Sequence, residues 1–182
     1  MSKIKLATIW LAGCSGCHMS FLDLDEWLLE LAEHVDVVYS PVGCDLKDYP
    51  DDVDVCLVEG AVANEENLEL IRIARKRTKF LVSFGDCAVT ANVPGMRNML
   101  GKAEPVLKRS YLELGDDSPQ LPHFPGIVPE LLDRVRPVHE VVDVDLFMPG
   151  CPPDADRIKS TLEPMLKGEQ PVMEGRDMIK FG

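Results

Sequence analysis

The chain has 182 residues, of which 46% are hydrophobic, and a formal net charge of −12. This composition supports a folded domain with a core and excludes a disordered chain. The negative charge argues against nucleic-acid and anionic membrane partners, because their phosphates would be repelled. The sequence shows no signal peptide, and no apolar run approaches the roughly 18 residues of a membrane helix. We therefore expect a cytoplasmic protein, in which the six cysteines are not a disulfide framework.

Strand and helix patterns alternate along the chain. Buried strands are predicted at residues 4–11, 35–39, 53–58, 79–84 and 144–148. Helices are predicted at residues 18–33, from an N-cap at Asn64 to about Arg77, and at 154–167, before Gly168. This alternation is typical of a parallel sheet with crossover helices.

The predicted fold class is therefore α/β, with a flavodoxin-like doubly wound parallel sheet and helices on both faces. Residues 1–182 are expected to form a single domain. The segment at about 101–140 departs from the pattern, since it contains six prolines and few periodic residues. We predict an irregular insertion there, which is either a contact surface or a solvent-covered loop.

Four of the six cysteines follow predicted strands. They are Cys14 and Cys17, which form a Cys-x-x-Cys pair, and the single residues Cys87 and Cys151. Because the carboxyl ends of parallel strands share one edge of the sheet, where ligands bind, we expect these cysteines to converge. Four thiolates are the ligand set of a [4Fe-4S] cluster. The sequence therefore predicts one such cluster, held by these four residues.

Other interpretations fit parts of this pattern. A structural zinc site would use the same four thiolates. A thioredoxin-like redox pair would explain Cys14 and Cys17 but would leave Cys87 and Cys151 without a role. A flavin-binding module is a further alternative, because flavodoxin-like sheets bind FMN at this edge, although the first loop lacks the small hydroxyl residues of a phosphate cradle.

For the other two cysteines, the sequence predicts different surroundings. Cys56 lies inside a predicted strand and is expected in the core, since free cysteine behaves as a small hydrophobic residue. Cys44 follows the second predicted strand and is the main rival for a ligand position.

Three polar residues lie beside the predicted ligands. Glu59 either has a polar role beside the cluster or on a proton path, or it is a surface carboxylate or a loop hydrogen-bond acceptor. His18 either donates to a sulfur or to a partner protein, or it is a capping or exposed residue. Asp86 is expected to cap a short helix.

Several segments also carry a resemblance to a known family. They are Trp10–Ser20 (WLAGCSGCHMS), Glu59–Gly60, Gly85–Ala88 (GDCA) and Pro149–Pro153 (PGCPP). The chain resembles the small subunits of [NiFe] hydrogenases over nearly its whole length. It looks most similar to the small hydrogenase subunit of the cytoplasmic NAD-reducing (soluble) hydrogenase.

The resemblance implies one proximal [4Fe-4S] cluster on Cys14, Cys17, Cys87 and Cys151. It implies a large subunit as partner, whose nickel–iron centre splits hydrogen, and diaphorase subunits with flavin and iron–sulfur groups that reduce NAD. The chain itself would only transfer electrons within this hydrogenase. An FMN at a subunit contact is compatible with such an assembly.

Two departures narrow the resemblance. Membrane-bound and periplasmic members have a twin-arginine signal and a second domain with two further clusters, and this sequence shows neither. Complex I subunits are also similar but typically have adjacent cysteines in the first motif, whereas Ser15 and Gly16 separate Cys14 from Cys17 here. Small subunits of F420-linked or sulfur-linked hydrogenases stay as close alternatives.

Overall fold

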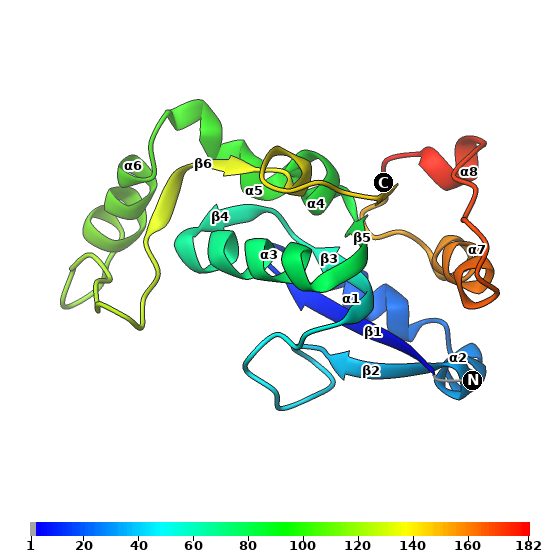
Figure 1. The fold of residues 1–182 in the computed structure, drawn as a ribbon. Helices are drawn as coiled ribbons and strands as arrows, with labels where there is room; N and C mark the ends of the chain where they lie inside the picture. The colour runs from blue at the N-terminus through cyan, green and yellow to red at the C-terminus, as the bar shows by residue number, and fades with distance from the viewer. Residues whose placement is uncertain (1–2) are drawn as a thin grey trace.

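Five strands form the central sheet of the structure, a computed structural model that describes residues 3–182. They are β1 (Ile4–Trp10), β2 (Val35–Tyr39), β3 (Val53–Glu59), β5 (Thr78–Phe84) and β7 (Leu146–Met148). Their spatial order is β2-β1-β3-β5-β7, and all four pairings are parallel (Figure 1). This is the flavodoxin-like order, in which the direction of winding reverses between β1 and β3. The predicted doubly wound sheet is confirmed.

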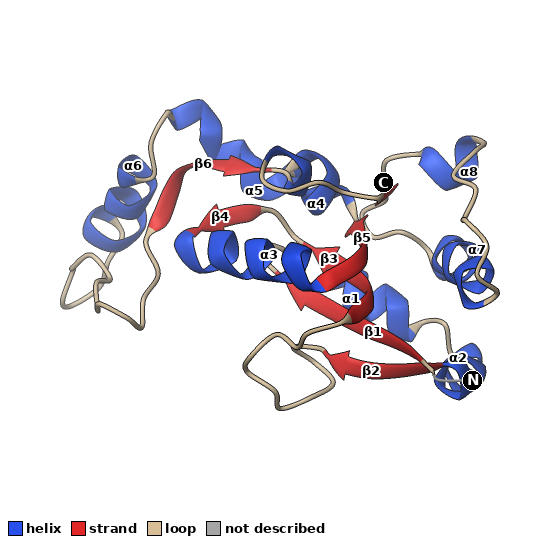
Figure 2. Ribbon diagram, in the orientation of Figure 1, coloured by secondary structure: helices blue, strands red, loops and turns tan. Residues whose placement is uncertain are grey.

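Helices cover both faces of this sheet (Figure 2), as the sequence predicts. One face packs against α1 (Gly16–Leu22), α2 (Trp27–His34) and α7 (Ala155–Leu166), and the other against α3 (Glu65–Arg77) and α4 (Asp86–Thr90). Within β3, Leu57 faces the first layer while Cys56 and Val58 face the second. Successive side chains of a strand point to opposite faces, so each central strand contributes to two cores.

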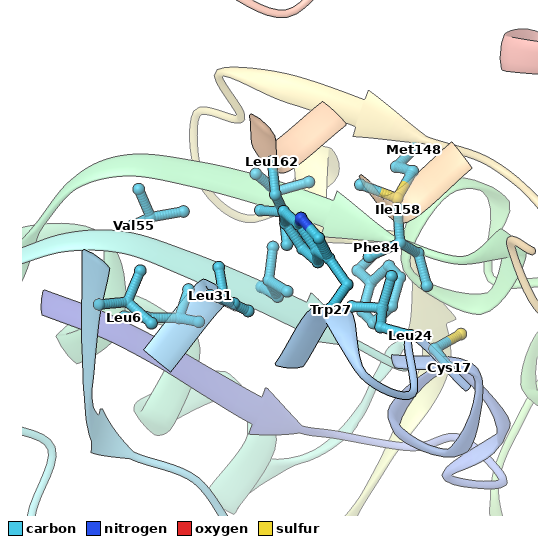
Figure 3. Packing of buried hydrophobic residues seen from close by; sticks show 13 residues of the cluster. Leu6, Cys17, Leu24, Trp27, Leu31, Val55, Phe84, Met148, Ile158 and Leu162 are labelled. Atoms are coloured by element: carbon cyan, nitrogen blue, oxygen red, sulfur yellow. The ribbon is translucent and has the colours of Figure 1, made fainter. Parts of the chain in front are cut away.

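The first core lies under α2 and α7. Figure 3 shows its side chains, with Trp27 of α2 close to Leu162 of α7 and Leu31 of α2 beside Leu6 of β1. Cys17 lies at the edge of this group, next to Leu24. One predicted ligand is therefore anchored by the packing of the core.

The prediction of a single helix at residues 18–33 is wrong, because the helix is interrupted in its middle. The structure has two helices, α1 and α2, separated by a turn at residues 23–26. Asp25 has a φ of 49° there, in the left-handed region that a right-handed helix cannot include. Leu24, in the turn, and Trp27, at the start of α2, both pack in the first core.

The predicted caps of the two long helices are confirmed. The Asn64 side chain accepts a hydrogen bond from the backbone N–H of Asn67 at 2.7 Å, which satisfies one free donor of α3. Acidic residues lie in the first turn of this helix and basic residues in the last, as the helix dipole favours. Helix α7 ends before Gly168, which has a φ of 74°.

The segment 101–140 contains more regular structure than the sequence suggests. It includes α6 (Glu104–Leu107), the π-helix η2 (Lys108–Glu113), β6 (Leu131–Arg136) and the 3-10 helix η3 (Val138–Glu140). Strand β6 pairs antiparallel with β4 (Val62–Asn64) in a small second sheet. This pairing joins residues far apart in the chain, so local periodicity did not reveal it.

Three short helices complete the described chain. They are α5 (Asn92–Gly95) and the 3-10 helix η1 (Met96–Leu100), which follow α4, and α8 (Arg176–Ile179), close to the carboxyl terminus. No helix within residues 3–182 combines the length and the apolar character needed to cross a membrane.

Candidate metal centre

The four predicted cysteine ligands lie at the carboxyl ends of three strands, Cys14 and Cys151 in loops and Cys17 and Cys87 in the first turns of α1 and α4. Cys14 and Cys17 follow β1, Cys87 follows β5 and Cys151 follows β7. Backbone hydrogen bonds join these loops, from the N–H of Gly85 to the carbonyl of Met148 and from the N–H of Asp86 to the carbonyl of Gly150, both at 2.8 Å. The parallel sheet thus brings together residues that are far apart in the sequence.

The first loop is joined to its neighbours in the same way. Ala12 exchanges two backbone hydrogen bonds with Ala61, at 2.8 and 2.9 Å, in the loop after β3. On the other side, the Ser20 hydroxyl of α1 donates to the carbonyl of Pro153. Backbone hydrogen bonds therefore join the Cys87 and Cys151 segments to each other, and the Ser20 side chain joins the first segment to the Cys151 loop.

The four sulfurs differ in exposure. Cys17 is buried, Cys87 is half-buried, and Cys14 and Cys151 are exposed. One side of the site therefore faces the protein core, and the other side opens to the surface. An electron carrier held here would be partly shielded from water and still accessible to a partner.

Small residues leave space around these sulfurs. A Cβ atom at Gly85 would lie 2.2 Å from the Cys17 Sγ, much closer than any normal contact. A Cβ at Gly16 would lie 3.2 Å from the Cys14 Sγ. Gly85 also has a φ of 85°, which side-chain-bearing residues rarely adopt. Glycine is therefore required beside Cys17 for both space and backbone conformation.

Two groups donate hydrogen bonds to the sulfurs. The Nδ2 of Asn92 lies 3.7 Å from the Cys151 Sγ. The backbone N–H of Val93 donates to the Cys87 sulfur, which lowers the pKa of that thiol. Donors of this kind stabilise negative charge on cluster sulfurs and tune the reduction potential. The sequence offered no motif that would have identified Asn92.

Other effects raise the pKa values of the buried thiols. Burial raises the pKa of Cys17 well above its usual range, and the charges of Glu59 and the other three cysteines add to this shift. Burial, Cys151 and Cys14 raise the pKa of Cys87 to about 11. The sulfurs are thus close enough to sense one another's charge. Because the thiolate is the metal ligand, metal binding must release these protons.

The donor set of four thiolates bears on the kind of metal group that could be held here. Among residues 3–182, no three His, Cys, Asp or Glu side chains are grouped closely enough to hold one metal ion. A single zinc ion would need all of its thiolates at about 2.3 Å from one centre. A [4Fe-4S] cube places each thiolate on a different iron, so its ligands stand further apart. The donor set and the glycine-lined space fit such a cluster.

Glu59 and His18 form a buried pair behind the first loop. Glu59 Oε2 accepts a hydrogen bond from the backbone N–H of His18 at 3.0 Å and also contacts the ring Nδ1. The ring Nε2 lies 3.0 Å from the Thr8 hydroxyl, which donates to Ser40 at 2.9 Å. Glu59 is thus a hydrogen-bond acceptor, one of its predicted roles. The expectation of a capping or exposed His18 is wrong, because the ring is buried in this network.

The prediction for Asp86 is also wrong. Gly85 is the N-cap of α4, and no side chain caps this helix. The Asp86 carboxylate instead accepts hydrogen bonds from the backbone N–H groups of Gly150, at 2.6 Å, and Gly182, at 3.1 Å. Asp86 therefore connects the loop of Cys87 with the loop of Cys151. Sequence reasoning missed this contact because it joins residues 64 positions apart.

The remaining cysteines have other surroundings. Cys56 is fully buried in β3, as predicted, and burial raises its pKa to about 12. Cys44 lies in the loop after β2, where its sulfur accepts a hydrogen bond from the Ser40 N–H at 3.1 Å and donates to the Ser40 carbonyl at 3.4 Å. These hydrogen bonds tie the Cys44 side chain to the backbone of Ser40, within the same turn.

Comparison with known proteins adds to this geometry. The family model described as "NADH ubiquinone oxidoreductase, 20 Kd subunit" matches residues 14–165, which include all four predicted ligands. The chain belongs to this family. The resemblance inferred from the motifs is confirmed by individual members.

Two relatives of this family are subunits of hydrogenases. The chain is 42% identical over 170 residues to the delta subunit of the NAD-reducing hydrogenase HoxS of Cupriavidus necator, covering 91% of this chain and 80% of the relative. It is also 42% identical over 174 residues to one subunit of the F420-non-reducing hydrogenase of Methanothermobacter marburgensis. That alignment covers 92% of this chain but only 55% of the relative, so the chain spans about half the length of such family members.

A solved member of the family has the same fold. The chain superposes on a subunit of an NAD+-reducing [NiFe]-hydrogenase, crystallised in the H2-reduced state, with a TM-score of 0.92 and 39% identity, covering all of both chains. A subunit of the Dm. baculatum [NiFeSe]-hydrogenase matches with a TM-score of 0.60 at 17% identity, which shows a common fold alone.

Proposed function

We propose that the chain is the electron-transfer small subunit of a cytoplasmic [NiFe] hydrogenase and holds one [4Fe-4S] cluster. The ligands are Cys14, Cys17, Cys87 and Cys151. The observation that carries the proposal is that these four cysteines lie at the carboxyl ends of β1, β5 and β7, where their charges act on one another. The family membership and the likeness to hydrogenase subunits support it.

The chain's own residues would bind and tune this group. A [4Fe-4S] cluster, when bound, accepts and donates one electron at a time. Cys17 would bind it from the buried side, where the protein core excludes water, and Gly85 leaves the space that the Cys17 sulfur needs. Asn92 and the Val93 N–H donate to two of the sulfurs and favour the more negative, reduced state. No bond of a substrate is made or broken by this chain.

The exposed side of the site is where a partner would approach. Cys14 and Cys151 lie there, so an electron could pass between the cluster and a nickel–iron centre in a large subunit. We propose that diaphorase subunits with flavin and iron–sulfur groups take the electron onward to NAD. The proposal also includes an FMN at a subunit contact. Extraction of flavin from the purified complex would test it.

NAD is the proposed acceptor because the solved neighbour that matches along both whole chains belongs to an NAD+-reducing enzyme. A second candidate acceptor also has support, since the F420-non-reducing relative has the same 42% identity. A third candidate function is that of a complex I-like subunit, which would not take its electrons from hydrogen.

The test is anaerobic purification of an affinity-tagged chain from the host cytoplasm with its natural partners. We expect a nickel-containing large subunit and flavin-containing subunits to co-purify, and we expect H2-dependent reduction of NAD. Reduction of another acceptor but not NAD would favour the second candidate. A chain that purifies without a nickel-containing partner, or a complex without H2 oxidation, would contradict the proposed function.

A further inference from the structure

One peptide group beside the site is held from both sides by buried charged residues. It joins Pro149 to Gly150, directly before Cys151. Its carbonyl accepts a hydrogen bond from Nη1 of Arg157, and its N–H donates to Oδ1 of Asp86 at 2.6 Å. We call this arrangement the Asp86–Arg157 clamp.

Both residues of the clamp are almost completely buried. Arg157 is 2% exposed and Asp86 is 5% exposed. A buried charge is costly unless it is paired and hydrogen-bonded. Here the two charges face each other through one polar peptide group, so each partly compensates the other. Burial of such residues at a surface loop requires a structural reason.

Further contacts of the pair extend the clamp. Asp86 also donates its own N–H to the Gly150 carbonyl at 2.8 Å, and its Oδ2 accepts from the Gly182 N–H. Arg157 Nη1 also donates to the Lys180 carbonyl at 3.0 Å. The clamp therefore ties the carboxyl-terminal segment to the Cys151 loop, and Figure 1 shows the terminus beside the end of β5.

The loop of Cys151 cannot hold itself with ordinary backbone hydrogen bonds. Proline has no N–H, and three of the five residues from Pro149 to Pro153 are prolines. Gly150 has a φ of 134°, and a Cβ there would lie 2.5 Å from the Pro153 Cα and 3.0 Å from Arg157 Nη1. The orientation of Cys151 therefore depends on contacts with other elements, which include the backbone N–H of Asp86 and the side chains of Asp86 and Arg157.

We propose that Asp86 and Arg157 are positioning residues that hold Cys151 in place as the fourth ligand of the cluster. The inference rests on the proposed function, since it concerns the same cluster. It assigns neither residue a contact with iron. The clamp acts through the peptide group that precedes the ligand.

The test compares Asp86→Leu and Arg157→Met with the conservative variants Asp86→Asn and Arg157→Lys. Asp145 and Arg75 provide controls away from the cysteines, because they also form an ion pair with backbone partners, although their side chains are more exposed, at 36% and 21%. Asp145→Leu and Arg75→Met should therefore reproduce a general loss of stability. Each variant is purified anaerobically in its complex, and iron per chain and EPR spectra are measured.

We expect Asp86→Leu and Arg157→Met to lose about one of four irons, because a three-iron cluster needs only three thiolates. The oxidised protein should then give the EPR signal of a three-iron cluster, whereas an oxidised [4Fe-4S] cluster is silent. Asp86→Asn and Arg157→Lys should recover much of the four-iron form. The two control variants should give no three-iron signal.

Two results would overturn the clamp. One is full iron and a wild-type spectrum in both Asp86→Leu and Arg157→Met. The other is a three-iron signal of equal size in the Asp145 and Arg75 controls. A wild-type chain without an iron–sulfur cluster would instead refute the proposed function, so the two failures are distinguishable.

Discussion

Replacement of Gly85 by alanine tests the space around Cys17. Gly85 has φ and ψ of 85° and 161°, a region that is essentially restricted to glycine and costs other residues about 1–3 kcal/mol. The added Cβ would also lie 2.2 Å from the Cys17 Sγ. Overpacking of this kind typically costs about 1–3 kcal/mol. We therefore expect a total loss of about 2–6 kcal/mol, a large part of the stability of an ordinary domain.

Gly175 provides a matched control for this prediction. Its φ and ψ are 84° and 156°, almost the same as at Gly85, but no heavy atom lies within 4 Å of an added Cβ. Gly175→Ala should therefore show the backbone cost alone, about 1–3 kcal/mol. The difference between the two variants isolates the contact with Cys17.

The assay is urea unfolding of both variants, together with iron per chain after anaerobic purification. Gly175→Ala should retain the iron of the wild type, whereas Gly85→Ala should lose most of it, because the Cys17 sulfur is displaced. Equal stability and equal iron in the two variants would refute the reasoning about this contact.

Three further predictions concern the scaffold. Asn64→Ala should lower the free energy of unfolding by about 1 kcal/mol, because α3 loses its N-cap, and an unchanged urea midpoint would contradict this. Ile71→Ala should cost about 2–5 kcal/mol by leaving a cavity between α3 and the sheet, measured in the same assay. The free energy of unfolding should fall as pH rises from about 9 to about 12, because the Cys56 thiol ionises in the unfolded chain before it can ionise in the folded one. Cys56→Ala should reduce this pH dependence, and an identical slope would count against it.

The meeting of the four cysteines could be predicted from the sequence for a simple reason. Each cysteine follows a strand pattern, and all parallel strands of one sheet end at the same edge. Neither a side-chain contact nor a distance is needed for this inference. The same reasoning placed Cys56 in the core, because it lies inside a strand rather than after one.

The details of the site depend on contacts that local patterns do not contain. Asp86 is of a residue type and at a position typical of a helix cap. Its carboxylate instead accepts a hydrogen bond from the N–H of Gly150, which lies much later in the chain. Arg157 lies in a helix with other charged residues, and nothing in the sequence distinguishes it as buried. The break at Asp25 is likewise not marked by the apolar spacing, because Leu24 and Trp27 are three residues apart and would share one face of a continuous helix.

The most direct test of the account is the iron–sulfur content of the cysteine variants. In the anaerobically purified complex, the wild-type chain should hold about four irons and four sulfides at this site. Serine replacements of Cys14, Cys17, Cys87 and Cys151, made one at a time, should each lose or alter the cluster signal, while Cys44→Ser should retain it. A zinc-containing, colourless chain, or a cluster that is lost with Cys44 but survives without Cys87, would contradict the account.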